Sequence, residues 1–109
     1  MGRDEAEAAY FALLRAREEL DAVRRYEEYL TTEAQRLRRF LREGAALADP
    51  VPRGTRRRIA HTDGPLTEAI ETRLRVIADE LPRLPQRLAA AEAHITECEA
   101  AHAALRDAR

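Results

Sequence analysis

The stretch "LLRAREELDAVRRYEEYLTTEAQRLRRFL", residues 13–41, carries apolar side chains at alternating intervals of three and four residues. The pattern extends in both directions into a series of twelve positions, ten of which are apolar. These positions are Ala6, Ala9, Leu13, Ala16, Leu20, Val23, Glu27, Leu30, Ala34, Leu37, Leu41 and Gly44. Such spacing, sustained over several heptads, places one apolar stripe along a helix and is typical of coiled coils. We therefore predict a long first helix over residues 4–48.

A second series with the same spacing follows in the other half of the chain, and again ten of its twelve positions are apolar. These positions are Thr67, Ile70, Leu74, Ile77, Leu81, Leu84, Leu88, Ala91, Ile95, Cys98, His102 and Leu105. Two helices of similar length with one connection predict an all-α fold, a long antiparallel helical hairpin whose stripes pack as a coiled coil. A chain of this length forms one domain, so residues 1–109 are predicted to be a single helical-hairpin domain.

Prolines and capping residues predict where the helices end. Pro50 ends the first helix, because the residue before a proline avoids helical geometry. Gly64, or the aspartate before it, can cap the second helix, with Pro65 in the first turn, where a missing N–H costs nothing. We therefore predict an Arg-rich loop over residues 49–63 and a second helix over residues 64–107.

Two further prolines fall inside the predicted second helix. Pro82 and Pro85 cannot donate hydrogen bonds to the carbonyls of Ala78 and Leu81, at a cost of about 3 kcal/mol for each interior proline. Either the helix kinks at this point, or it ends and a new helix starts at Pro82. The apolar series continues through these positions without a break, and this continuity favours a kink near Pro82 and Pro85.

Several large apolar side chains lie off the two stripes, and three of them cluster near the start of the first helix. The set consists of Tyr10, Phe11, Leu14, Tyr26, Tyr29, Phe40, Leu66 and Val76. An exposed apolar cluster usually marks association, and a homodimer assembled as a four-helix bundle would bury it. We predict that Tyr10, Phe11 and Leu14 form an oligomer interface. The alternative is that they pack only on the C-terminal end of the second helix.

Charge is distributed unevenly along the chain. Residues 36–61 hold eight arginines and two acidic residues, whereas the rest of the chain holds eleven arginines and eighteen acidic residues. The guanidinium of arginine is a planar fork that suits phosphate or carboxylate. We predict that the tip of the hairpin binds an acidic protein partner or a polyanion through Arg38, Arg39, Arg42, Arg53, Arg56, Arg57 and Arg58. One alternative is a nucleic-acid-binding regulator that contacts the phosphate backbone, and another is a loop that is charged only to stay solvated.

The segment "HITECEAAH", residues 94–102, contains residue types that bind metals. His94, Cys98 and His102 follow one another at intervals of four residues, on one helical face. Glu99 and His102 form the Glu-x-x-His pattern used by metal-binding helical bundles. Three ligands along one straight helix cannot all reach one tetrahedral ion. We therefore predict no metal or other cofactor, and keep a metal-binding helical bundle as a second alternative function.

Catalytic motifs are missing from the sequence. It contains no serine and only four glycines, and no Gly-rich phosphate loop is present. We therefore predict that the protein is not an enzyme.

No apolar run approaches the ~20 residues that a membrane span needs, and the single cysteine suits a reducing compartment. The prediction is a cytoplasmic coiled-coil interaction or adaptor protein that self-associates and does not act on membranes.

Overall fold

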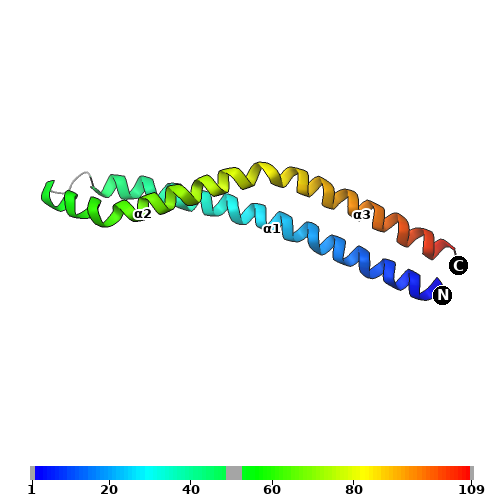
Figure 1. Ribbon diagram of the computed structural model, residues 1–109. Helices are drawn as coiled ribbons and strands as arrows, with labels where there is room; N and C mark the ends of the chain where they lie inside the picture. The colour runs from blue at the N-terminus through cyan, green and yellow to red at the C-terminus, as the bar shows by residue number, and fades with distance from the viewer. Residues whose placement is uncertain (1, 49–52, 109) are drawn as a thin grey trace. The chain divides into compact units, whose positions relative to one another are not determined.

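Alanine, leucine, arginine and glutamate dominate this chain, and all four are strong helix formers. The computed structural model describes residues 2–48 and 53–108, with side chains at 3–44, 53–55 and 64–108. Helices α1 (Gly2–Ala48), α2 (Arg53–Glu80) and α3 (Leu84–Asp107), with the 3₁₀ helix η1 (Leu81–Arg83), cover all of the described residues except Ala108 (Figure 1). The all-α prediction is confirmed for this part of the chain.

The helices form two compact units. Unit 1 contains Met1–Glu27 and Arg83–Arg109, and unit 2 contains Glu28–Pro82. In unit 1, the first half of α1 packs against α3 in antiparallel order, because Arg17 pairs with Glu99 and Arg24 pairs with Glu92. In unit 2, the rest of α1 lies beside α2 (Figure 1). Each unit is therefore an antiparallel helix pair of the kind that the predicted hairpin requires.

The buried side chains lie on the predicted seam. Among the side chains that the structure describes, nine apolar residues are buried, and all nine belong to the two apolar series: Ala6, Leu13, Ala16, Leu20, Leu30, Ala34, Ile70, Ile77 and Leu84. Leu30, Ile77 and Leu84 are the largest side chains with almost no exposed surface. The other described positions of the two series are half-buried, except for Gly44, which is exposed. A single pair of helices can bury only a narrow stripe from each helix, and so the core is one row wide.

The predicted loop boundaries are wrong on the C-terminal side. Helix α2 begins at Arg53, so positions 53–63, which were predicted as loop, are helical. Pro65 lies inside α2 instead of in its first turn, and the predicted capping positions, Gly64 and the residue before it, also lie inside the helix. The missing N–H of Pro65 costs one backbone hydrogen bond, but the arginines before it favour a helix. The remainder of the predicted loop, residues 49–52, lies outside the described residues.

The second helix, predicted over residues 64–107 with a kink near Pro82 and Pro85, is instead divided into two α-helices at these prolines. The α-helix ends at Glu80, a single 3₁₀ turn follows over Leu81–Arg83, and α-helix resumes at Leu84 with Pro85 in its first turn. A 3₁₀ turn bonds each N–H to the carbonyl three residues back rather than four, and such turns are common as short connectors between α-helices. Leu84 remains fully buried at this point, so the apolar series passes through the turn without losing its register.

A charged pair joins the two helices of unit 2. Arg73 donates to both carboxylate oxygens of Glu33, from Nε to Oε1 at 2.7 Å and from Nη2 to Oε2 at 3.0 Å. Bidentate pairs of this kind have a fixed geometry as well as charge attraction. The hydrogen bond from Arg73, with a further one from Tyr29, lowers the pKa of Glu33 below its ordinary value. Because the pair has one geometry, it helps to specify which residues of α1 and α2 face each other.

This pair predicts an acid-sensitive contribution to stability. A carboxyl group whose pKa is lower in the folded chain stabilises the fold above its unfolded pKa, and this contribution is lost as pH falls through the folded pKa. The melting temperature of the wild type should exceed that of Glu33→Gln at neutral pH, and the gap should shrink below about pH 4. Thermal melts followed by circular dichroism across this range provide the measurement. Glu68→Gln, at an exposed carboxylate of the same unit, should show no comparable gap. A gap for Glu33→Gln that stays constant with pH contradicts the prediction.

Candidate interaction surfaces

An aromatic pair stands on the outer side of α1. Tyr10 and Phe11 are 45% and 50% exposed, and their rings meet edge to face at 5.8 Å. Tyr10 also lies against the ring of His102 in α3, with the two centroids 5.7 Å apart. Leu14, one turn further along α1, is half-buried. Tyr10 therefore packs in part on the end of the second predicted helix, as the alternative expects. Phe11 remains exposed, which the alternative does not explain.

The other off-stripe apolar residues are also exposed, as predicted. Tyr26, Tyr29, Phe40, Leu66 and Val76 are between 37% and 58% exposed. Tyr26 lies beneath the guanidinium of Arg87, which stands 6.0 Å from the ring centroid. Single exposed apolar residues are common on protein surfaces and need no partner. The contiguous pair at the start of α1 is the more informative feature.

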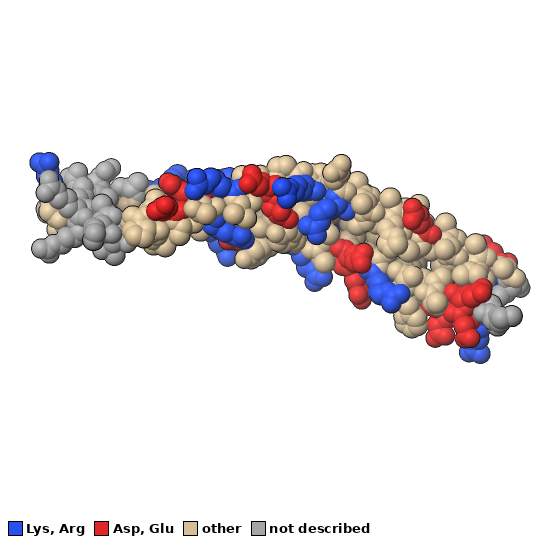
Figure 2. Space-filling view, in the orientation of Figure 1, with Lys and Arg blue, Asp and Glu red and all other residues tan. Residues whose placement is uncertain are grey.

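One edge of the α1–α3 seam is lined by charged groups. Arg17 reaches Glu99 at 4.0 Å and Arg24 reaches Glu92 at 3.6 Å, and all four side chains are more than half exposed. Exposed pairs of this kind contribute little to stability, but they keep this edge hydrated. The face in Figure 2 likewise has acidic and basic side chains interspersed.

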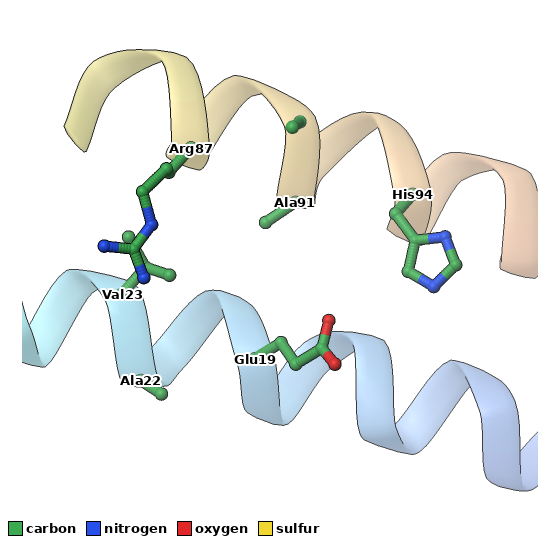
Figure 3. A pocket seen from close by; sticks show the side chains of 7 residues that line it. Glu19, Ala22, Val23, Arg87, Ala91 and His94 are labelled. Carbon is green, nitrogen blue, oxygen red and sulfur yellow. The ribbon is translucent and has the colours of Figure 1, made fainter. Parts of the chain in front are cut away.

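The other edge of the same seam is an open groove. Ala22 and Arg24 flank the seam residue Val23 on opposite sides, because successive helical residues are about 100° apart. Ala90 and Glu92 flank Ala91 in the same way. The alanine side of each helix leaves a groove of about 450 Å³, lined by Glu19, Ala22, Val23, Arg87, Ala90, Ala91 and His94 (Figure 3). Glu19 is on the wall formed by α1, and Arg87 and His94 are on the wall formed by α3.

The Arg-rich part of the chain is divided between two helices of unit 2. Arg38, Arg39 and Arg42, on the last turns of α1, are exposed, and so is Arg53 at the start of α2. Arg39 donates from Nε to Oε1 of Glu43 at 2.8 Å, which raises its pKa. The predicted residues Arg56, Arg57 and Arg58 occupy helical positions in α2, and their side chains lie outside the described part of the structure.

The candidate metal ligands do not converge. The Sγ of Cys98 lies 3.7 Å from Nε2 of His94, one turn away. Glu99 faces Arg17 on the charged edge, and His102 faces the ring of Tyr10. Among the described residues, no group of three or more His, Cys, Asp or Glu side chains is placed to hold one metal ion.

Two features of these surfaces were missed in the sequence. The Glu33–Arg73 pair has no local signal, because its members are far apart in the chain. The groove has a weak signal: alanine stands at exposed positions beside the seam, where coiled coils usually carry charged side chains.

In the described residues, no helix has the length and apolar character needed to cross a membrane. The chain matches no family model, and neither a curated protein nor a solved structure is significantly similar to it.

Proposed function

We propose that this chain is a non-enzymatic helical interaction protein that self-associates through α1 and binds an acidic partner or polyanion through its Arg-rich region. The observation that carries the proposal is the exposed Tyr10–Phe11 pair, beside a core only one row of side chains wide. A long helix pair with so narrow a core gains stability when a second pair covers its apolar side chains. The single cysteine, Cys98, is compatible with a cytoplasmic protein.

The self-association surface consists of Tyr10, Phe11 and Leu14. Exposed aromatic residues that lie next to each other favour association, since burying them removes a large apolar area from water. In a four-helix bundle made from two copies, this surface of each α1 would face the other copy. The ring of Tyr10 also lies against the ring of His102, so this residue of the surface contacts α3.

The double variant Phe11→Glu, Leu14→Glu tests this surface. The wild type should sediment as a dimer or larger assembly at tens of micromolar, and the variant should have a lower mass, because four buried carboxylates per dimer would lack partners. The matched control is Phe40→Glu, Val76→Glu, which adds the same charge at two exposed apolar positions of unit 2. A wild-type monomer at this concentration contradicts self-association, and equal effects of the two double variants contradict the assignment of the surface.

The anion-binding part of the proposal rests on charge. No acidic residue lies in the first turn of α2, where aspartate and glutamate are normally favoured by the helix dipole. Arginine occupies this turn instead, so the positive electrostatic potential of the helix N-terminus and that of the arginine side chain add together. Arg38 and Arg42 contribute further exposed charge from α1. The alternative partner is the phosphate backbone of a nucleic acid. Binding to a DNA duplex and to polyglutamate distinguishes the two partners.

A further inference from the structure

The first half of α1 carries an outer row of side chains in addition to the seam that packs on α3. Its six members are spaced alternately four and three residues apart, as the seam residues are: Arg3, Glu7, Tyr10, Leu14, Arg17 and Asp21. Successive residues of a helix are about 100° apart, so the outer row lies on one side of α1, roughly a quarter turn from the seam. In a four-helix bundle each helix packs on two neighbours, and the outer row lies where the second neighbour of α1 would be.

The charged members of the outer row are accessible to a second protein, since all four are exposed. Among the side chains that the structure describes, none forms an ion pair with Arg3, Glu7 or Asp21. Arg17 lies 4.0 Å from Glu99, but more than half of its side chain is exposed. A guanidinium has several N–H donors, so Arg17 can also donate to a second carboxylate.

The charges of the outer row follow an order that fits a reversed copy of the same row. Starting from Arg3, the members are positive, negative, apolar, apolar, positive and negative. The apolar pair at the middle is centred on position 12. Glu7 and Arg17 lie equally far from this position on opposite sides, and so do Arg3 and Asp21. A second outer row that runs in the opposite direction therefore presents the opposite charge at each charged level.

We propose that α1 of a second copy packs on the outer row in antiparallel order, related by a two-fold axis that crosses α1 level with position 12. Glu7 of each copy then faces Arg17 of the other copy, and the symmetry makes this contact twice. Arg3 and Asp21 face each other in the same way. Between these charges, the apolar pair of each copy covers that of the other, and the exposed Phe11, next to the axis, lies near its counterpart.

A two-fold axis that runs along the helices would give a parallel pair instead. Each member of the outer row would then lie opposite the same residue of the second copy, so Glu7 would face Glu7 and Arg17 would face Arg17. Like charges at four levels repel, and charged residues beside an apolar contact set the orientation of paired helices. Asp4 and Glu18 stand seven residues from Phe11 on either side and are not members of the outer row. The charge order of the row therefore favours the antiparallel pair.

Charge reversal tests this orientation, which rests on the proposed self-association. Glu7→Arg alone and Arg17→Glu alone should each weaken the dimer by about tenfold or more, because both copies of the contact become repulsive. An equimolar mixture of the two variants should dimerise again, since every arginine at these positions then faces a glutamate of the other chain. A contact within one chain would not be restored by mixing. Sedimentation equilibrium measures the dissociation constants, and circular dichroism checks that each variant is helical.

The outer contact and a matched control complete the experiment. Arg3→Glu and Asp21→Arg should behave in the same way, alone and mixed, and they leave Arg17 and its neighbour on α3 unchanged. The control variants are Glu5→Arg and Arg15→Glu, which reverse the same charges at exposed positions of α1 that lie off the outer row. Neither control variant should change the dissociation constant by more than about twofold, since exposed charges away from a contact interact weakly.

The results distinguish this inference from the self-association on which it rests. A wild-type monomer overturns both. If the wild type is a dimer that Phe11→Glu, Leu14→Glu dissociates, the apolar surface is upheld, and the charge variants decide the orientation. Unchanged dissociation constants for Glu7→Arg and Arg17→Glu overturn the antiparallel pair, because a parallel pair only exchanges one set of like charges for another. A mixture that stays monomeric also overturns it.

Discussion

Replacing Ile77 with alanine is expected to lower the free energy of unfolding by about 2–5 kcal/mol. The side chain is 1% exposed and lies on the seam of unit 2, where the core is one row of side chains wide. Truncation removes buried methyl and methylene groups and leaves a cavity that a pair of long helices can close only in part. A core this narrow has few other residues to share the loss.

The neighbouring residue provides the control. Val76 is 50% exposed, so Val76→Ala removes methyl groups that already face water. Both substitutions exchange a β-branched residue for alanine in the same turn of α2, and so both gain a similar helix propensity, of about half a kcal/mol. Urea unfolding followed by circular dichroism should show a clear loss for Ile77→Ala and little change for Val76→Ala. Equal losses would mean that the seam is not the core of unit 2.

The seam could be predicted because its signal is local and repeated. Ala6, Leu20, Leu30 and Ile77 were all identified from spacing, and each is buried. Every turn of a heptad pattern indicates which side of the helix faces its partner. A single polar residue at one of these positions therefore does not change the prediction. Glu27 stands at such a position with a carboxylate, and it is half-buried there.

The start of α2 could not be predicted in the same way. Gly64 and Pro65 together form a good local signal for the beginning of a helix, but the helix runs back through them to Arg53. A cap is one interaction of about 1 kcal/mol, so a local capping signal does not by itself fix where a helix begins. The sequence located the irregularity near Pro82, because two prolines three residues apart remove two hydrogen bonds from adjacent turns, but the favoured kink within one helix is instead a 3₁₀ turn between two α-helices.

A candidate surface could be predicted where the type of a residue and its position on the helix were enough to identify it. Phe11 is apolar and off the stripe, and it is exposed as its position predicts, whereas Leu14, also off the stripe, is half-buried. The groove depends instead on which small residues of α1 and α3 come together, and that requires the register of the pair. Glu19 and Arg87 are ordinary surface residues in the sequence, and only the arrangement of the helices makes them two walls of one groove.

The variant in which Arg56, Arg57 and Arg58 are all changed to alanine is expected to lose most of its affinity for polyanions. These positions lie in the first turns of α2, near the positive end of its dipole. Phosphate contacts release counterions, so each lost contact should reduce the slope of log K against log salt by about 0.9 for duplex DNA. Three lost contacts predict a slope that is smaller by up to about 2.7 and an affinity at low salt reduced on the order of tenfold or more.

Two probes and one matched variant decide what this region binds. Fluorescence anisotropy with a random-sequence DNA duplex and with polyglutamate, each over a range of salt concentrations, separates a phosphate backbone from an acidic protein surface. The control variant changes Arg15, Arg25 and Arg75 to alanine, which removes the same charge from exposed positions outside the Arg-rich region. The helical circular dichroism of both variants should match that of the wild type, because alanine favours a helix at least as well as arginine. If both triple variants lose equal affinity, only net charge matters and the start of α2 is a solvated surface. A loss confined to Arg56, Arg57 and Arg58 means that their placement on α2 makes the binding site.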